Sequence, residues 1–280
     1  MATLHLVATP IGNLEDVTLR ALRVLAEAEL VLAEDTRQTR KLLDRHGVDA
    51  KPVSLHGHNE ARRAALVLEV LGRGGDVALV SDAGTPLVSD PGERLVRAAL
   101  DAGHGVSAVP GASAVLGALV ASGLPVQPFS FLGFPPRKPG ERRAGFATLR
   151  GRPETLVFFE SPRRLAATLR DLADTLGSRR ACVARELSKL HEELARDTLE
   201  ALAERFAGGA RGEVTLVVEG APAGAAAPDD ALLDAAIRAR AAAGGGPSEI
   251  ARDVARATGA ARRSVYERVL AAARGPRSRG

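Results

Sequence analysis

The residues best suited to chemistry lie in one short loop that combines carboxylates, prolines and glycines. The loop reads Ser81-Asp-Ala-Gly-Thr-Pro-Leu-Val-Ser-Asp-Pro-Gly92. Glycines let a backbone approach a ligand closely, and prolines hold a loop in one shape, which lowers the entropy lost on binding. The same residues also suit a tight turn capped by aspartate at the start of a helix. Composition alone therefore leaves a ligand site and a structural turn equally open.

Two further polar clusters follow short apolar runs. Thr9-Pro-Ile-Gly-Asn-Leu14 could meet a nucleotide-like ligand, but it has one glycine where the dinucleotide-binding fingerprint has three. The chain also lacks a Gly-Lys-Ser/Thr phosphate loop, which argues against ATP hydrolysis. His56-Gly-His-Asn-Glu60 offers alternate histidines that could ligate zinc. No third ligand has suitable spacing, so we expect a polar loop that faces substrate and no metal.

The elements that position these clusters alternate regularly. Apolar runs predict strands at 4–8, 30–33, 53–55, 77–80 and 106–109, and helical spacing predicts helices at 18–28, 37–45, 61–71 and 93–102. Such alternation is typical of a parallel α/β sheet. In open α/β sheets ligands bind beyond the carboxyl ends of the strands. All the clusters described above fall at such ends, so we expect them to lie together.

A second α/β block and a helical tail follow. Strands are expected at 155–159, 181–184 and 213–218, with helices at 165–176 and 199–206. An Ala/Gly/Pro linker at 221–228 leads to helices at 229–243, 248–257 and 262–273. The expected domains are therefore residues 1–113, 114–221 and 229–280. Residues 248–270 resemble a helix-turn-helix pattern, and nucleic-acid contact and a simple helical cap both remain open for this tail.

Charge is distributed unevenly over the 280 residues, whose net charge is +4. Residues 137–152 hold six basic residues and one acid, and residues 229–280 hold ten arginines and six acids. The remainder is therefore net negative, at about −5. Such asymmetry predicts a polyanionic partner that meets two particular surfaces. Aromatic residues make up only 3% of the chain, which argues against a base-stacking platform for single strands.

Cysteine usage and hydropathy bear on the compartment. Cys182 is the single cysteine, so neither an internal disulfide nor a cysteine zinc cage is possible, and a reducing cytoplasm is expected. The N-terminus has no basic region followed by a long apolar core, so no signal peptide is expected. Residues 105–136 carry no charge, but Pro110, Pro125 and Pro128 interrupt them. We expect a buried segment between domains there and no membrane span.

Together these motifs resemble the bacterial ribosomal RNA small subunit methyltransferases, a family within the tetrapyrrole methylase superfamily of S-adenosylmethionine enzymes. The resemblance covers residues 3–220 in the family's order, and the basic helical tail is also similar. The stretches that carry it are Val7-Ala-Thr-Pro-Ile-Gly-Asn-Leu14, Ala33-Glu-Asp-Thr-Arg37, His58-Asn-Glu60, Val80-Ser-Asp-Ala-Gly-Thr-Pro86, Ser89-Asp-Pro-Gly92, Val109-Pro-Gly-Ala-Ser113, Phe131-Leu-Gly-Phe-Pro-Pro136, Phe159-Glu-Ser-Pro-Arg163, Arg185-Glu-Leu187 and Lys189.

The resemblance implies two α/β domains with the cofactor in the cleft between them, a homodimer, and 2′-O-methylation of a cytidine in 16S rRNA, usually numbered cytidine 1402. It also implies the residues that approach S-adenosylmethionine: Pro10, Ile11, Gly12, Asp82, Ala83, Gly84, Leu87, Ser89, Asp90, Ser113, Ala114, Phe159 and Leu187. Tetrapyrrole-modifying relatives usually begin with a Gly-x-Gly-x-Gly-Asp loop. The Thr9-Pro-Ile-Gly-Asn-Leu14 loop of this chain favours the RNA branch.

Methyl transfer to a ribose hydroxyl needs alignment of the oxygen with the methyl group and the sulfur, and a positioned base would help because the hydroxyl is a poor nucleophile when protonated. The candidate bases at strand ends are Glu34, Asp35, His58 and Glu60. Ion pairing and helix capping remain alternative roles for each. The expected RNA contacts are Arg37, Arg137, Lys138, Arg142, Arg143, Arg262 and Arg263.

Two other functions remain open at this stage. A tetrapyrrole C-methyltransferase of the corrinoid or sirohaem type on the same fold would not need the basic stretches. A nucleic-acid-binding regulator built on the tail would leave the loop clusters at the strand ends without a purpose.

Overall fold

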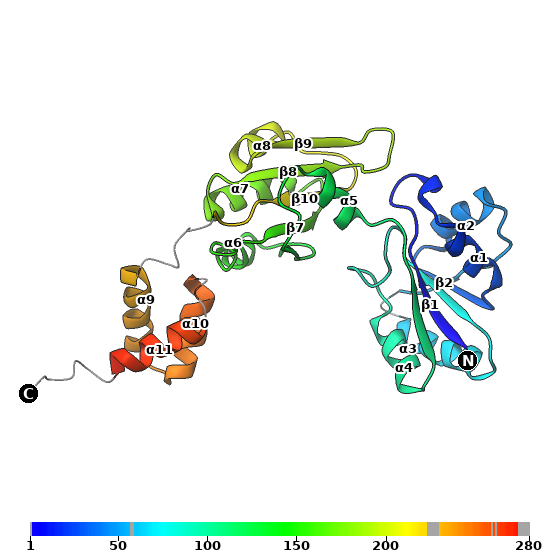
Figure 1. The fold of residues 1–280 in the computed structure, drawn as a ribbon, viewed down its shortest axis with the longest axis horizontal. Coiled ribbons are helices and arrows are strands. Elements are labelled where there is room, and N and C mark those ends of the chain that lie inside the picture. Colours follow the sequence, from blue (N-terminus) through cyan, green and yellow to red (C-terminus); the bar gives the residue numbers. More distant parts are fainter. Residues whose placement is uncertain (1, 57–58, 223–229, 259, 261, 274–280) are drawn as a thin grey trace, which may run out of the picture. The chain divides into compact units, whose positions relative to one another are not determined.

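The computed structural model describes residues 2–56, 59–222, 230–258, 260 and 262–273 (Figure 1). The chain divides into two compact units. Unit 1 comprises Met1–Ala118 together with Arg185–Glu193, and unit 2 comprises Leu119–Ala184 together with Leu194–Gly280. The boundary expected after residue 113 thus falls inside unit 1. The return of residues 185–193 to unit 1 was not predicted.

Unit 1 is built on a five-stranded sheet with the order β3-β2-β4-β1-β5. Its strands are β1 (Thr3–Val7), β2 (Leu30–Ala33), β3 (Val53–Ser54), β4 (Val77–Val80) and β5 (Gly105–Val109). All four neighbouring pairs are parallel, with Leu4 opposite Val77 and Thr3 opposite Gly105 at the starts of their ladders. The expected parallel α/β sheet is therefore confirmed.

Helices cover both faces of this sheet. The helices α1 (Leu19–Glu27) and α2 (Thr36–Arg45) bury Leu25 and Leu43 against Val7, Ala33 and Val80. The helices α3 (Glu60–Gly72) and α4 (Glu93–Asp101) pack on the opposite face, in a second core that includes Leu4, Leu32 and Leu79. Along the strands, the residues of this second core alternate with those of the first. Side chains alternate between faces along a strand, so these two cores lie on opposite sides of the sheet.

This arrangement creates a switch point between β1 and β4. β1 leads into α1 on one face, and β4 leads into α4 on the other, although the two strands are neighbours. Where neighbouring strands send their connections to opposite faces, the loops diverge and leave room beyond the carboxyl ends of the strands. The loops that begin at Ala8 and Ser81 leave the sheet at this point.

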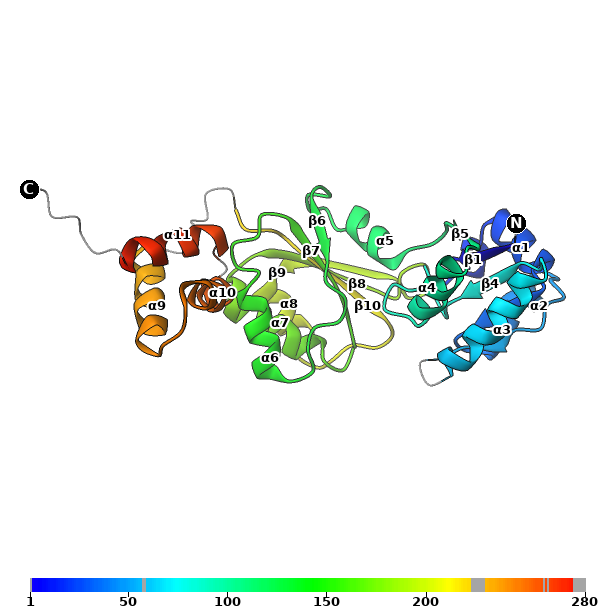
Figure 2. The ribbon, with the colours of Figure 1, turned by 90° about the horizontal axis from the view of Figure 1, so that it is seen from below.

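Unit 2 contains a second five-stranded sheet with the order β6-β7-β10-β8-β9. Its strands are β6 (Phe129–Phe131), β7 (Thr155–Glu160), β8 (Arg180–Arg185), β9 (Glu193–Thr198) and β10 (Val214–Val218). β6 is parallel to β7, and β7 is antiparallel to β10. The helices α6 (Pro139–Ala147), α7 (Leu165–Leu176) and α8 (Leu199–Arg205) pack side by side on this sheet (Figure 2). The strands β6 and β9 and the helix α6 were not predicted.

The tail forms three helices, as expected: α9 (Asp230–Ala242), α10 (Pro247–Thr258) and α11 (Arg262–Ala273). They share a small apolar core that includes Leu233, Ile237, Ile250, Val254 and Val265.

The charge-free stretch at 105–136 contains β5, the short helix α5 (Ala114–Ala121) and β6. Within the described ranges, no helix combines the length and the apolar character that crossing a membrane requires.

Candidate functional site

The loops after β1 and β4 are joined at the switch point by their backbones. The N–H of Thr9 donates to the carbonyl of Gly84 at 2.9 Å, and the N–H of Gly84 donates back to Thr9 at 3.0 Å. The Thr9 hydroxyl also donates to the carbonyl of Ser81 at 3.1 Å. Gly84 has a φ of +77°, and a Cβ there would lie 3.4 Å from Cγ2 of Ile11. Glycine is thus required by conformation, and the two loops form one surface.

Asp82 ties a third loop to this pair. Its Oδ1 accepts a hydrogen bond of 2.8 Å from the backbone N–H of Asp35, which follows β2. β2, β4 and β1 are consecutive in the sheet, so the loops at three neighbouring strand ends are linked. The sequence-based expectation that these clusters meet at one edge is met for the loops beginning at residues 8, 34 and 81.

The chain beyond Gly84 is held in unusual backbone conformations. Leu87 and Ser89 have φ values of +73° and +75°, in the left-handed region that residues other than glycine rarely adopt. The N–H of Ser89 donates to the carbonyl of Leu87 at 3.0 Å. At Gly92, with φ +129°, a Cβ would lie 2.6 Å from Cδ2 of Leu79. Such strained residues cluster at ligand sites, where the surroundings hold them in place.

Carboxylates gather at these strand ends and disfavour one another's ionisation. Burial raises the pKa of Glu34, and the charges of Asp90, Asp82 and Asp35 raise it further. Burial also raises the pKa of Asp90, as does the charge of Asp82, while a hydrogen bond from Ser81 opposes the shift. Like charges held close together in a partly buried place have this effect. The cluster of Glu34, Asp82 and Asp90 is therefore an electronegative site that a cationic ligand would stabilise.

The candidate bases differ in their surroundings. Asp35 caps α2 by accepting from the N–H of Arg37 at 2.8 Å, and its carboxylate pairs with the Arg37 guanidinium at 2.7 Å. These contacts lower the pKa of Asp35 to about 2, which leaves it a weak base. Glu60 is buried and accepts from the N–H of Arg94, in the first turn of α4, at 3.0 Å. His58 lies outside the described residues. Glu34 is the described candidate whose environment suits proton transfer.

The segment Arg185–Glu193 closes over the first loop. A Cβ at Gly12 would lie 2.6 Å from the carbonyl oxygen of Leu187 and 2.5 Å from Cγ of Lys189. Ser188 has a φ of +65°, and its hydroxyl bonds to the carboxylate of Asp16. A Cβ at Gly117, in α5, would lie 3.9 Å from Cδ1 of Leu187. Leu187 therefore lies between the loop after β1 and the start of α5.

The expected cofactor contacts are thus placed mostly in one unit. Unit 1 holds twelve of them: Pro10, Ile11, Gly12, Asp82, Ala83, Gly84, Leu87, Ser89, Asp90, Ser113, Ala114 and Leu187. Phe159 lies on β7 in unit 2. Its ring packs between Phe131, at a centroid distance of 4.8 Å, and Phe134, at 5.5 Å.

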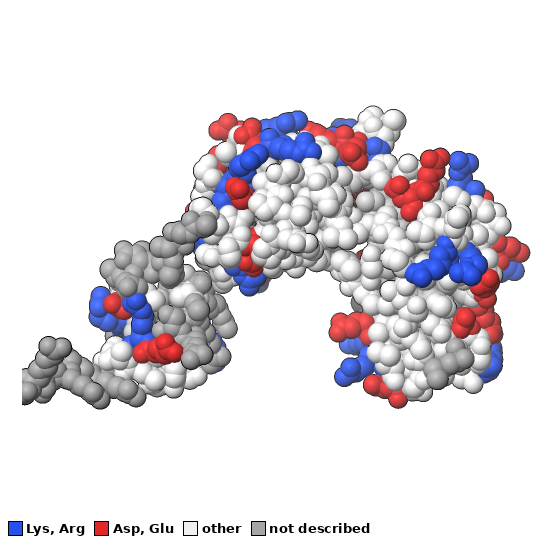
Figure 3. All heavy atoms as spheres, viewed as in Figure 1, with Lys and Arg blue, Asp and Glu red and all other residues white. Residues whose placement is uncertain are grey.

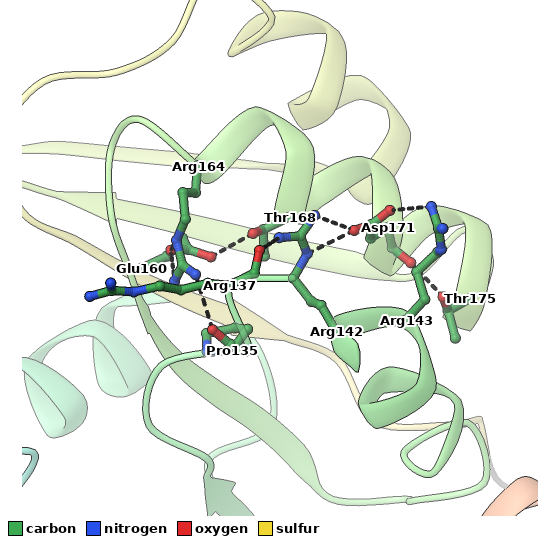
Figure 4. Close-up of polar contacts among 9 residues, drawn as sticks. All are labelled: Pro135, Arg137, Arg142, Arg143, Glu160, Arg164, Thr168, Asp171 and Thr175. Atoms are coloured by element: carbon green, nitrogen blue, oxygen red, sulfur yellow. Dashed lines mark hydrogen bonds and ion pairs between the residues drawn. The ribbon is translucent and has the colours of Figure 1, made fainter. Parts of the chain in front are cut away.

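Arg142 needs correction as an expected RNA contact. Its side chain is buried, and its guanidinium pairs with Asp171 while also bonding to the carbonyl of Arg137 at 3.4 Å (Figure 4). A buried guanidinium that already has an acidic partner is not available to a phosphate. Asp171 also pairs with Arg143, at 3.5 Å. The formal charge of residues 137–152 therefore overstates the charge that this segment presents.

The other expected RNA contacts differ in their surroundings. Arg37 and Lys138 are exposed, and each pairs with a carboxylate, Asp35 at 2.7 Å and Glu141 at 2.9 Å. Arg137 is exposed, and its guanidinium has no ion-pair partner among the residues that the structure describes. The side chains of Arg262 and Arg263 are not among those that the structure describes. On the face drawn in Figure 3, basic side chains are interspersed with acidic ones over both units.

Comparison with known proteins agrees with this architecture. The family model for Tetrapyrrole (Corrin/Porphyrin) Methylases matches residues 3–203. The chain belongs to the tetrapyrrole methylase family. Among solved tetrapyrrole methylases, uroporphyrin-III-C-methyltransferase from Thermus thermophilus is 25% identical, with a TM-score of 0.57 over 78% of this chain and 94% of that one. A second structure, of a uroporphyrin-III C-methyl transferase from Thermus thermophilus complexed with S-adenyl homocysteine, has a TM-score of 0.55 and 21% identity.

Relatives within the tetrapyrrole methylase family are more similar in sequence. A protein of Mesorhizobium japonicum named Ribosomal RNA small subunit methyltransferase I is 47% identical over 268 residues, which cover 95% of this chain and 91% of that protein. A protein of Mycobacterium tuberculosis with the same name is 51% identical over 218 residues, or 76% of each chain. The first alignment is long enough to include the helical tail.

Proposed function

We propose that this protein transfers a methyl group from S-adenosylmethionine to the ribose 2′-oxygen of a cytidine in 16S rRNA, at the position numbered cytidine 1402. The observation that carries the proposal is the 47% identity, over 95% of the chain, to a relative named as a small-subunit ribosomal RNA methyltransferase. That relative's name supports methylation of small-subunit rRNA, and we propose the cytoplasm as the compartment of this reaction. The proposal goes beyond that name in two respects, the ribose 2′-oxygen as methyl acceptor and the identity of the nucleotide.

The site at the switch point suits the chemistry of S-adenosylmethionine. This cofactor carries a methyl group on a positively charged sulfonium, and it also carries an ammonium group. Glu34, Asp82 and Asp90 form an electronegative cluster, and the raised pKa values of Glu34 and Asp90 favour a positive ligand nearby. Gly84 brings backbone close to the same place without a side chain. We assign cofactor binding to these loops and to the other residues expected from the resemblance.

Glu34 is the candidate base that we propose. It lies directly after β2, and burial and its acidic neighbours raise the pKa of its carboxyl above the ordinary value, which makes it a stronger base. Asp35 and Glu60 are engaged as helix caps. The remaining catalytic requirement is alignment of the ribose oxygen, which the rigid loops supply.

A second copy of the chain is the proposed protein partner. α5 carries no charged residue, and Leu116 and Val120, one turn apart on the helix, are 53% and 70% exposed. Exposed apolar side chains at this spacing are typical of a surface that another protein covers. Measurement of the mass in solution by light scattering tests the dimer: a monomer at micromolar concentration would contradict it.

The function is tested by methyl transfer from labelled cofactor to small ribosomal subunits that lack this modification. Free 16S rRNA, a porphyrinoid and a reaction without acceptor are the comparison arms. Alkaline hydrolysis of the labelled RNA then locates the methyl group, because cleavage of the chain needs a free 2′-oxygen and a 2′-O-methyl group blocks it at that nucleotide. Label in the porphyrinoid alone, or in a base of the RNA, would overturn the proposal.

A further inference from the structure

A loop of unit 2 presents an exposed aromatic ring beside an arginine that has no acidic partner among the described residues. The loop joins β6 to α6 and comprises residues 133–138, which we call the Phe134 loop. Phe134 is 55% exposed, and Arg137 and Lys138 are also exposed, whereas Pro135 between them is buried. Phe134 is the most exposed aromatic side chain among the described residues, since Phe129 and Tyr266 are each 39% exposed.

Backbone hydrogen bonds to β7 hold the start of the Phe134 loop. The N–H of Leu132 donates to Val157 at 2.9 Å, and the N–H of Phe159 donates to the carbonyl of Gly133 at 3.1 Å. The ring of Phe159 supports the ring of Phe134 at a centroid distance of 5.5 Å. Because Phe134 precedes a proline, its backbone is also restricted to extended conformations. The backbone that carries the exposed ring is therefore restricted, and the ring itself contacts Phe159.

Two ion pairs, each with a buried carboxylate, hold the remainder of the loop (Figure 4). The carboxylate of Glu160 pairs with Arg164 at 2.6 Å, and Arg164 donates from its other terminal nitrogen to the carbonyl of Pro135 at 3.2 Å. In the same way the guanidinium of Arg142, paired with Asp171, bonds to the carbonyl of Arg137. Each arginine therefore links a buried carboxylate to the backbone of the loop.

In Figure 4 the Arg137 side chain extends away from the Arg142–Asp171 ion pair. Within the described part of the chain its guanidinium has no acidic partner, although it lies in a segment where the other arginines are engaged. An exposed ring and an exposed guanidinium three residues apart match an unpaired nucleotide, whose base stacks on an aromatic face and whose phosphate binds a cation.

We propose that Phe134 stacks on an unpaired base of the small-subunit rRNA and that Arg137 binds a phosphate of the same strand. This rests on the proposed function and adds the residues that hold the substrate. It also revises the expectation from the low aromatic content: few aromatic residues suffice when one of them is fixed and exposed. Glu160, Arg164, Arg142 and Asp171 are positioning residues in this proposal, because their contacts hold the backbone of the loop.

The test measures methyl transfer to unmodified small subunits for the full chain with Phe134→Ala, Phe134→Tyr and Leu100→Ala. Leu100 lies on α4 with a similar exposed fraction, 51%, and serves as the matched control. We expect Phe134→Ala to raise KM for the subunit by roughly 5- to 150-fold, the range given by loss of one stacked base. Phe134→Tyr and Leu100→Ala should keep the wild-type KM, and the affinity for S-adenosylmethionine should be unchanged in all three.

The salt dependence of subunit binding distinguishes the two residues. Arg137→Ala should lower the slope of log affinity against log salt by about 0.7, as expected for one phosphate contact on a single strand. Phe134→Ala should weaken binding with the slope unchanged. Arg97→Ala is the control, since Arg97 is 80% exposed and lies on α4 beside Asp101.

Three outcomes would overturn the inference. If the wild-type protein is active and Phe134→Ala keeps the wild-type KM for the subunit, this inference is overturned and the proposed function is not. Conversion of the protein from dimer to monomer by Phe134→Ala would assign the ring to a protein contact. Absence of any methyl transfer to or binding of subunits by the wild type would overturn the proposed function and this inference with it.

Discussion

Thr9 and Gly84 pair through both of their backbone hydrogen bonds, although 75 residues separate them in the sequence. Thr9 follows β1 and Gly84 follows β4, so this short bridge extends the sheet beyond its carboxyl edge at the switch point. The two loops are therefore one mechanical element. A substitution in either loop should disturb the ligand contacts of both.

Replacing Gly84 by valine should greatly weaken S-adenosylmethionine binding. The φ of +77° disfavours a branched side chain, at a cost of about 1–3 kcal/mol, and the new Cβ would lie 3.4 Å from Ile11. Gly47→Val is the matched control, because Gly47 has a φ of +65° and open space around it. Calorimetric titration of the folded variants measures the affinity.

Asp82→Ala should weaken cofactor binding in the same assay, because it removes both a negative charge and the hydrogen bond to the N–H of Asp35. We expect both Asp82→Ala and Gly84→Val to remain folded. Unchanged affinity in both variants would remove this loop from the cofactor site.

Glu34→Gln should lower turnover by about 10²- to 10⁴-fold, as expected for loss of a general base. It should weaken cofactor binding less than Asp82→Ala does, because it removes one negative charge and no hydrogen bond between loops. The raised pKa of Glu34 means that wild-type kcat/KM falls with decreasing pH while the pH is still above 4.5, the ordinary value. The glutamine variant should lose this acidic limb. Normal turnover in alanine variants of Glu34, Asp35, His58 and Glu60, each tested singly, would show that catalysis rests on positioning.

The carboxyl of Asp35 should titrate near pH 2, below its ordinary pKa of 3.8, because Arg37 bonds to the ionised form. A lowered folded-state pKa contributes stability above the unfolded value, and this stability is lost as the pH falls from about 4 to about 2. Carbon-detected NMR titration follows the carboxyl directly. Asp35→Asn should show a weaker dependence of the urea midpoint on pH in this window, and an identical dependence would contradict the assignment.

Arg142→Met should destabilise the protein by about 3–5 kcal/mol, because it leaves the carboxylate of Asp171 buried with one weaker partner. The double variant Arg142→Met with Asp171→Leu should recover much of that loss, since two buried charges are removed together. Arg143→Met, at a side chain that is 56% exposed, is the control and should cost little. Urea unfolding measures the free energies, and a stable Arg142→Met variant would contradict a structural role.

Deletion of residues 229–280 should weaken binding to small subunits and reduce its salt dependence. The slope of log affinity against log salt should fall by about 0.7 for every phosphate that the tail neutralises. Binding of S-adenosylmethionine should persist, because the proposed cofactor loops all precede residue 220. Charge reversal at Arg262 and Arg263 should reproduce part of the effect. A dimeric truncated protein that binds subunits as tightly, with the same salt slope, would show that the tail only caps the fold.

Much of unit 1 could be predicted because its signals are local. Each strand is a short apolar run followed by a polar or glycine-rich loop, and the predicted and observed strands differ at their ends by about one residue. The meeting of the loops followed from the parallel topology, since all carboxyl ends lie at one edge of the sheet. The helix α6 was missed because Pro139 and Gly140 open it, and proline at a first helical turn resembles a loop in sequence.

Long-range partners could not be predicted from local pattern. Glu60 looked like an exposed base, but its partner is the backbone of Arg94, which lies 34 residues away. The charge count over residues 137–152 included Arg142, which is neutralised by Asp171 on another helix. Net charge therefore points to a class of partner, but it cannot identify which arginines are free to meet that partner.

The division of unit 1 into two stretches of chain has a consequence for its synthesis. The ribosome completes residues 1–118 well before residues 185–193, yet Gly12 packs against Leu187 and Lys189 from the later stretch. The first unit therefore leaves the exit tunnel with its loop after β1 uncovered. It can reach its final form only after β8 has been made, so the proposed cofactor site of the nascent chain is incomplete until about two thirds of the chain has been translated.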